Sequence, residues 1–178
     1  AELLACISEN QTDLAIMVRP PTDMDTVAQA FAPHPYVIVA APQHPLVGRK
    51  KIPMARIMKE PFVLREKGSD TQHALEDAFG EHLPQLRMAM EIRSTETIKQ
   101  AVIAGMGLGF LSAHTLSLEL QTGSLAVLDV QGFPLMRNWY VVHRRTKRLP
   151  PVALAFKDFL LADGEDLIEK IVPLGPVH

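Results

Sequence analysis

The sequence contains a single cysteine, Cys6, so it can form neither an internal disulfide nor a CxxC metal site. Basic residues are not in excess either, since 18 lysines and arginines stand against 20 acidic residues, a formal net charge of −2. A chain that grips DNA phosphates normally carries clustered basic charge, so we expect any DNA-binding part to lie outside this chain. No apolar run approaches the ~20 residues of a membrane-spanning helix, and no signal peptide is recognisable. We therefore expect a cytoplasmic protein without membrane contact.

Motifs for catalysis, metal binding and nucleotide binding are also missing. The seven histidines form no HExxH pair, and neither a GxSxG elbow nor a GxxxxGK[ST] phosphate loop occurs. The glycines of 105–109 follow a helical pattern and precede a strand pattern, the reverse of a dinucleotide-binding loop, so we expect them to serve turns and close packing. Cys6 lies on an apolar helix face, where an inert thiol is expected. We predict no catalytic residue, no metal ligand and no cofactor.

What the sequence does contain is an alternation of strand and helix patterns, which predicts an α/β fold. Short apolar runs predict strands at 14–18, 36–41, 61–64, 88–92, 108–111 and 138–143. Apolar residues at helical spacing predict helices at 3–10, around 54–58, after Ser69, between Ser94 and Gly105, at 113–120 and after Pro151.

Three expectations concern burial. The run 14–18 is continuously apolar, which is typical of a strand buried on both faces. The last helix is expected to bury the stripe Val152, Ala155, Phe156, Phe159 and Leu160. Five methionines are expected to fill the core: Met54, Met58, Met88, Met90 and Met106.

The segment 65–71 is the first candidate binding site, because it joins a predicted strand to a predicted helix start. Unpaired N–H groups and a partial positive charge make a helix N-terminus a ready anion site. Gly68 allows close backbone approach, Ser69 and Thr71 offer hydroxyl donors, and Arg65 and Lys67 add positive charge. The alternative is that Ser69 only caps its own helix and that the charges are solvated.

Arg93, Ser94 and Thr95 form a second hydroxyl-rich helix start after a strand. Two such starts can face one crevice at the carboxyl ends of neighbouring strands, and that site would favour carboxylates or phosphates. Three acidic residues would repel an anion if they faced inward: Glu66, Asp70 and Glu96. Capping alone is again the alternative for Ser94.

Five segments occur in order and with suitable spacing for one known family. They are Asp13-Leu14-Ala15-Ile16, then the segments 41–46 (APQHPL), 61–71 (PFVLREKGSDT), 98–111 (IKQAVIAGMGLGFL) and 133–139. Together they resemble the effector-binding domain of bacterial LysR-type transcriptional regulators over essentially the whole chain. The stretches 93–112 and 133–145 are more narrowly similar to regulators of RuBisCO (carbon-fixation) operons.

The resemblance implies a two-lobed, type 2 periplasmic-binding-protein-like fold that is N-terminally truncated. Residues 1–42 and 140–178 would form an incomplete lobe I, and residues 43–139 would form lobe II. A small anionic effector would lie between the lobes, contacted by the loop 65–71 and the helix start 93–95. Arg93 stands where relatives often have a hydroxyl residue, which favours a more highly charged ligand or removes the contact.

The resemblance also implies partners. DNA would be bound only through an N-terminal helix-turn-helix domain absent here, and the full-length protein would be a dimer or tetramer. Effectors of the narrower group would be phosphorylated metabolites such as ribulose bisphosphate or phosphoenolpyruvate, or NADPH.

Two other functions stay open. A solute-binding receptor of a transporter would share the fold, and a signal peptide in place of a helix-turn-helix would distinguish it. An enzyme would use Arg65, Lys67 and Arg93 to hold a phosphorylated substrate, but no paired acid and base accompanies them.

Overall fold

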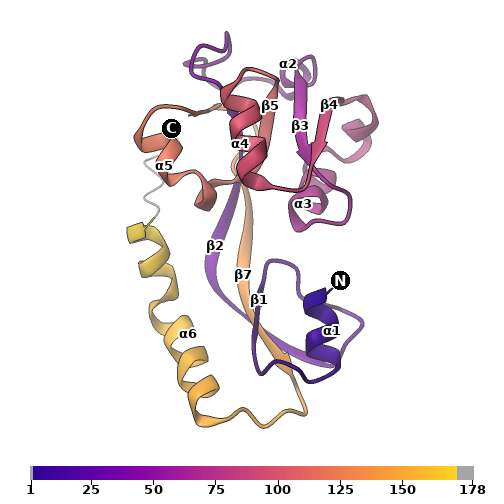
Figure 1. Ribbon diagram of the computed structural model, residues 1–178, viewed down its shortest axis with the longest axis vertical. Helices are drawn as coiled ribbons and strands as arrows, with labels where there is room; N and C mark the ends of the chain where they lie inside the picture. The colour runs from indigo at the N-terminus through magenta and orange to yellow at the C-terminus, as the bar shows by residue number, and fades with distance from the viewer. Residues whose placement is uncertain (1, 172–178) are drawn as a thin grey trace. The chain divides into compact units, whose positions relative to one another are not determined.

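The computed structural model describes residues 2–171 and divides them into two compact units. The first unit combines residues 2–34 with Arg137–Ile171, and the second is the continuous segment Pro35–Met136. The strands β2 (Thr26–Ala40) and β7 (Leu135–Arg144) run across the two boundaries along the chain (Figure 1). The α/β class predicted from the sequence is confirmed.

The boundaries at 34/35 and 136/137 fall earlier than the predicted lobe boundaries at 42/43 and 139/140. The reason lies in β2, whose residues Tyr36 to Val39 pair antiparallel with β5 (Leu108–Ser112) and so belong to the sheet of the second unit. The first part of β2 was not predicted, because Pro33 and Pro35 interrupt it and prolines argue against a strand. Whether the two units act as effector-binding lobes stays a prediction.

The first unit contains α1 (Glu2–Ser8), β1 (Ala15–Met17) and α6 (Pro151–Ile171) beside its parts of β2 and β7. Ile7 packs with Ala15, Met17 and Val142, and β1 pairs antiparallel with β7. The prediction that 14–18 is buried on both faces is wrong, since Ile16 is exposed. β1 is the first strand in the order β1-β7-β2-β5-β3-β4, and only its face with Ala15 and Met17 is covered.

Helix α6 buries a different face from the predicted one. Val152 is 76% exposed, and Phe156 and Phe159 are also exposed, whereas Ala153 and Leu160 are buried. Small residues decide this face, because a Cβ at Gly164 would lie 2.8 Å from the ring of Phe31. The helix therefore approaches β2 through Gly164 rather than through its aromatic side chains, and of the predicted stripe only Leu160 is buried.

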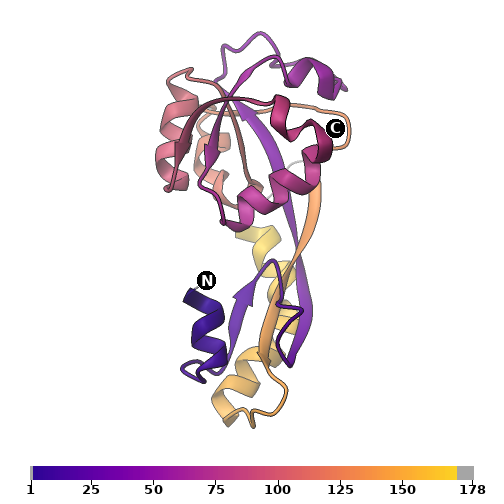
Figure 2. The same cartoon turned by 90° about the vertical axis from the view of Figure 1, so that its right-hand side faces the viewer.

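In the second unit, helices connect the strands of a mixed sheet along the chain and lie beside that sheet (Figures 1 and 2). In chain order its further elements are α2 (Met54–Ile57), β3 (Pro61–Arg65), α3 (Asp70–Phe79), η1 (Gly80–Gln85), β4 (Arg87–Ile92), α4 (Thr95–Ile103), η2 (Ala113–Thr115), α5 (Ser117–Gln121) and β6 (Ala126–Val127). The strand order here is β2-β5-β3-β4, with β6 paired to β2. β3 runs parallel to both β4 and β5.

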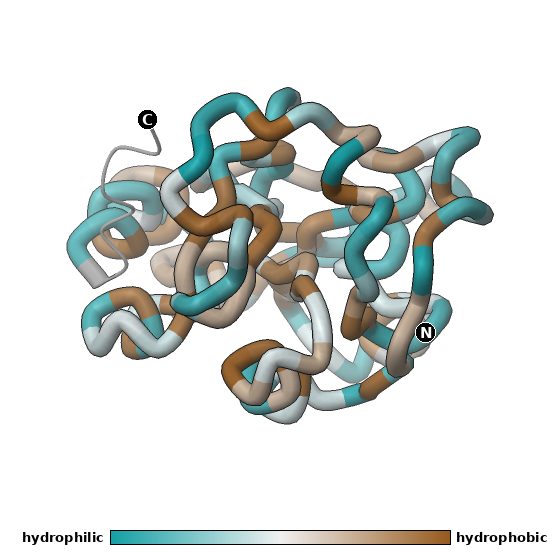
Figure 3. Tube along the Cα trace, turned by 90° about the horizontal axis from the view of Figure 1, so that it is seen from above, coloured by the Kyte–Doolittle hydropathy of each residue, from teal (hydrophilic) through white to brown (hydrophobic). Residues whose placement is uncertain are grey.

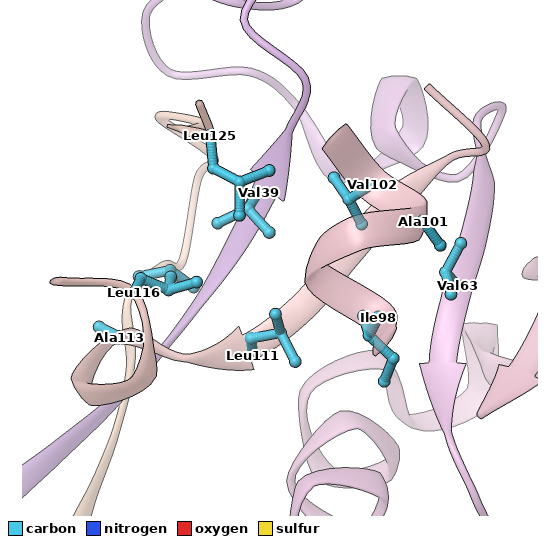
Figure 4. Packing of buried hydrophobic residues seen from close by; sticks show 10 residues of the cluster. Val39, Val63, Ile98, Ala101, Val102, Leu111, Ala113, Leu116 and Leu125 are labelled. Carbon is cyan, nitrogen blue, oxygen red and sulfur yellow. The ribbon is translucent and has the colours of Figure 1, made fainter. Parts of the chain in front are cut away.

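One core cluster of the second unit lies between α4 and the sheet. Ile98 and Val102 of α4 are fully buried and point toward Leu111 on β5 and Val63 on β3 (Figure 4). Brown and teal segments alternate along the trace in Figure 3, as expected for elements with one apolar and one polar face. The helix predicted between Ser94 and Gly105 is confirmed.

The glycines of 105–109 serve turns and close packing, as predicted. Gly105 ends α4 at a φ of +78°. A Cβ at Gly107 would lie 2.6 Å from the carbonyl oxygen of Pro61, and one at Gly109 would lie 3.0 Å from the side chains of Val102 and Val39. A side chain at either position would push α4 or β3 away from β5.

The methionine prediction is wrong for three of its five members. Met88 is 54% exposed, and Met90 and Met106 are also exposed, while Met54 and Met58 are half-buried. For the first two, both faces of β4 are uncovered, because five of its six residues are exposed.

Candidate anion-binding site

The candidate site lies where two neighbouring parallel strands of the second unit each lead into a helix. β3 and β4 are in register at their carboxyl ends, with Arg65 opposite Ile92, and their arrows in Figure 1 point the same way. α3 begins five residues after Arg65 and α4 three after Ile92. The two predicted helix starts therefore lie at the carboxyl ends of neighbouring strands, as the sequence indicated.

The hydroxyl of Ser69 is engaged by the backbone around it. Ser69 Oγ accepts a hydrogen bond from the N–H of Gln72 at 3.1 Å and donates to the carbonyl of Glu66 at 2.9 Å. The turn that brings these groups together needs a φ of +84° at Gly68, which glycine adopts freely. Ser69 thus caps α3, the simpler of its two predicted roles, and its contact with an effector stays a prediction.

Ser94 and Thr95 open α4 in a similar way. Ser94 Oγ accepts a hydrogen bond from the N–H of Thr97 at 3.3 Å, so it caps the helix. Thr95 Oγ1 instead accepts a hydrogen bond from Nη1 of Arg65 at 3.1 Å. This bond joins the two predicted segments, which are 30 residues apart in the sequence.

Arg65 is the residue around which the site is built. Its Nε donates to Oε2 of Glu66 at 2.8 Å and its Nη2 to Oε1 of the same carboxylate at 2.9 Å, a forked pairing. The hydrogen bond to Glu66 raises the pKa of the Arg65 guanidinium above its ordinary value. The same bond, joined by the charge of Arg93, lowers the pKa of the Glu66 carboxyl, so both groups are charged at neutral pH.

The other predicted contacts lie around this pair. Arg93 is exposed, and its charge acts on the Glu66 carboxylate. Lys67 and Gly68 are exposed on the turn, and Thr71 is half-buried in the first turn of α3. Of the predicted residues, Arg65 therefore contacts both the Glu66 carboxylate and the Thr95 hydroxyl, and Arg93 acts on Glu66 through its charge.

Sequence reasoning missed an ion-pair network behind α4. Lys99 is buried, and its Nζ lies 2.7 Å from Oε2 of Glu96, 2.7 Å from Oε1 of Glu119 and 3.3 Å from the carbonyl of Thr115. Burial opposes the charge of Lys99, but the hydrogen bonds to Glu119 and Glu96 outweigh it and the pKa is raised. The spacing of Glu96 and Lys99, three residues apart on a helix, was the available signal.

The network decides what Glu96 does. The hydrogen bond from Lys99 lowers the pKa of Glu96 and pairs its carboxylate with an ammonium group. Of the three acids that would repel an anion if they faced inward, Glu96 is thus held by Lys99 and Glu66 by Arg65.

Other kinds of site find no support in the residues that the structure describes. Across residues 2–171, no three His, Cys, Asp or Glu side chains gather as ligands for a metal ion. Within the same range, no helix is both long and apolar enough to cross a bilayer.

Comparison with known proteins adds the family. The LysR substrate binding domain matches residues 1–165. The chain belongs to this family. It is 45% identical over 162 residues to a RuBisCO operon transcriptional regulator of Allochromatium vinosum, and 46% identical over 167 residues to one of Acidithiobacillus ferrooxidans. These alignments cover 91% and 92% of this chain but 54% of each relative, so the chain spans about half the length of these regulators.

A solved structure extends the comparison to a bound ligand. The regulatory domain of Synechocystis PCC6803 CcmR, in complex with 2-PG, matches with a TM-score of 0.85 and 38% identity. The match covers 90% of this LysR-family chain and 77% of that one. The effector-binding domain of QuiR, in complex with shikimate, matches at a TM-score of 0.79 and 19% identity and supports the fold alone. The relatives named here regulate transcription, so the transporter-receptor alternative gains no support.

Proposed function

We propose that this LysR-family chain is the effector-sensing part of a regulator of carbon-fixation genes, and that it binds a phosphorylated or carboxylated metabolite at Arg65. The observation that carries the proposal is the bond between Arg65 and Thr95, which brings the loop 65–71 and the start of α4 to one guanidinium. A guanidinium beside two helix starts offers an anion positive charge and forked donors. The helix starts add backbone N–H groups.

The relatives support the ligand class. CcmR, whose regulatory domain is 38% identical, binds 2-PG, an anionic phosphorylated metabolite. RuBisCO operon regulators are 45% and 46% identical. We therefore place phosphorylated metabolites first among the effectors, ahead of dicarboxylates and sulfate.

The remaining parts of the proposal concern the whole protein. DNA binding would reside in a helix-turn-helix domain on the part of the regulator that this chain does not span, and the assembled regulator would be a cytoplasmic dimer or tetramer. The chain itself would carry out no reaction, since the Arg65 site pairs its charges without placing a free acid and base together.

A thermal-shift screen tests the proposal. The chain is incubated with 2-PG, ribulose bisphosphate, phosphoenolpyruvate, NADPH, a dicarboxylate or sulfate, and a ligand that binds the folded state raises the midpoint of unfolding by mass action. The proposal predicts the largest shift with a phosphorylated metabolite and its loss in Arg65→Ala.

Arg87→Ala is the matched control. Arg87 is exposed at the first residue of β4, the end of that strand remote from the site, and its removal changes the net charge equally. The control should retain the shift of the unmodified chain. The proposal is contradicted if the shift survives in Arg65→Ala, or if no anion shifts the unfolding midpoint.

A further inference from the structure

The fork of Arg65 is already filled by a neighbouring side chain. Two of the three guanidinium nitrogens donate to the Glu66 carboxylate at 2.8 and 2.9 Å, and the third donates to Thr95. A carboxylate held by a forked guanidinium is the geometry that an effector carboxylate or phosphate would itself adopt. Glu66 thus occupies the place that the proposed effector needs.

From this contact we infer that Glu66 is a built-in competitor of the effector, a carboxylate that fills the Arg65 fork in the free protein and leaves it when an anion binds. The inference rests on the function proposed above. In this role, Glu66 sets the effector concentration at which the sensor responds. It also makes the sensor prefer ligands of higher charge.

The charges around the fork favour competition. The negative charges of Glu66 and Asp70 both act on Arg65, and Glu66 also lies in the field of Arg93. A singly charged anion therefore meets a weaker attraction to Arg65 while Glu66 stays in place. A phosphate dianion offers more charge than the single carboxylate it replaces, so it displaces Glu66 more readily than a monoanion does.

The surroundings of the pair allow the exchange. The side chains of Arg65 and Glu66 are 20% and 26% exposed, so Glu66 has access to water when it leaves the fork. Arg65 keeps its bond to Thr95 Oγ1, which holds the guanidinium in place independently of Glu66. Glu66 also lies at the start of the turn that contains Gly68, outside any helix or strand.

Isothermal titration calorimetry of the chain with 2-PG, and separately with inorganic phosphate, tests the inference in Glu66→Gln. The amide keeps the size of the side chain but removes its charge. Because only its oxygen is an acceptor, it cannot accept both hydrogen bonds of the Arg65 guanidinium as the carboxylate does. We expect the variant to bind about tenfold more tightly than the unmodified chain, since one repelling charge beside the ligand is removed. The preference for 2-PG over a monocarboxylate such as acetate should fall.

The control is Glu76→Gln, the same change at an exposed position in the second half of α3. It should leave both affinities unchanged. An equal gain in Glu76→Gln would mean that net charge alone sets the affinity, and it would overturn the inference.

The outcomes separate the inference from the proposed function. Binding that is lost in Arg65→Ala but unchanged or weaker in Glu66→Gln overturns the inference, because Glu66 would then only position Arg65, and leaves the proposed function standing. Binding that persists in Arg65→Ala, or is absent from all variants, overturns both. Binding that appears or strengthens only when Glu66 is neutralised supports both.

Discussion

Two of the cation–carboxylate pairs in the second unit, Lys99 with Glu119 and Arg65 with Glu66, have nearly equal distances. Lys99 Nζ lies 2.7 Å from Glu119, and Arg65 Nε lies 2.8 Å from Glu66. Their burial differs, because the Lys99 and Glu119 side chains are 11% and 7% exposed whereas those of Arg65 and Glu66 are 20% and 26% exposed. Distance alone therefore does not distinguish a structural ion pair from one available for binding.

The partners of each pair explain the difference. Lys99 and Glu119 join α4 to α5, and losing one of them leaves a charge with little access to water. Arg65 and Glu66 are adjacent in the chain, so their bond ties no distant elements together, and only the bond to Thr95 does so. We infer that the Lys99 pair holds the second unit together and that the Arg65 pair serves the ligand.

The largest effect is expected from breaking the buried pair. Glu119→Ala should lower the free energy of unfolding by about 3–5 kcal/mol, because it leaves the ammonium of Lys99 buried with only Glu96 and a carbonyl. Urea denaturation gives the value. The double substitution Lys99→Met with Glu119→Leu should recover most of the loss, and a loss below about 1 kcal/mol in Glu119→Ala alone would remove the distinction between the two pairs.

Breaking the half-buried pair should affect binding more than folding. Arg65→Ala is expected to weaken 2-PG binding at least about tenfold, about 1.4 kcal/mol, while the free energy of unfolding falls by about 1 kcal/mol or less. Calorimetric titration and urea denaturation measure the two quantities on the same samples. A large loss of stability without a loss of affinity would assign Arg65 to the structure instead.

A smaller effect on stability is expected from removing the serine cap of α3. Ser69→Ala should cost about 1 kcal/mol, since the N–H of Gln72 then loses its side-chain acceptor. Ser69→Asn should retain most of the stability, because asparagine caps helices as well as serine does. Thermal unfolding compares the two, and equal losses would mean that Ser69 does more than cap α3.

The smallest effect concerns pH. Burial lowers the pKa of His114 below its ordinary value of 6.5, so the unfolded chain takes up a proton there before the folded chain does. The contribution of His114 is therefore complete above about pH 6.5 and declines as the pH falls below that value. His114→Gln should flatten the dependence of the unfolding midpoint on pH in this range, and thermal unfolding at several pH values measures it; an unchanged dependence would contradict the prediction.

The sequence predicted most elements of the second unit, because their signals are local. Ser69 and Ser94 mark the two helix starts, Gly105 marks the end of α4, and the run 61–64 is a buried strand. The buried face of α6 was not predictable from apolar spacing, since the close approach of Gly164 to Phe31 decides it. The exposure of Met88 and Ile16 likewise depends on which faces of β4 and β1 other elements cover, and no local pattern reveals that.

For the candidate site, the sequence indicated the two segments but not how their charges are paired. That Arg65 contacts Thr95 follows from the parallel register of β3 and β4, which depends on the fold. The roles of Glu66 and Lys99 depend on side-chain directions at a turn and on a helix, so composition left open whether the acids would oppose an anion.

The most direct test of the account is to observe the Arg65 guanidinium itself while ligand is added. Nitrogen-15 NMR resolves the Nε–H signals of arginine side chains, and Arg65→Lys assigns the signal of Arg65 by its disappearance. The account predicts that 2-PG shifts this signal in a saturable way while the signal of Arg87 stays in place. A saturable shift of other signals with Arg65 unmoved would contradict the account, because the ligand would then bind without the guanidinium on which the site is built.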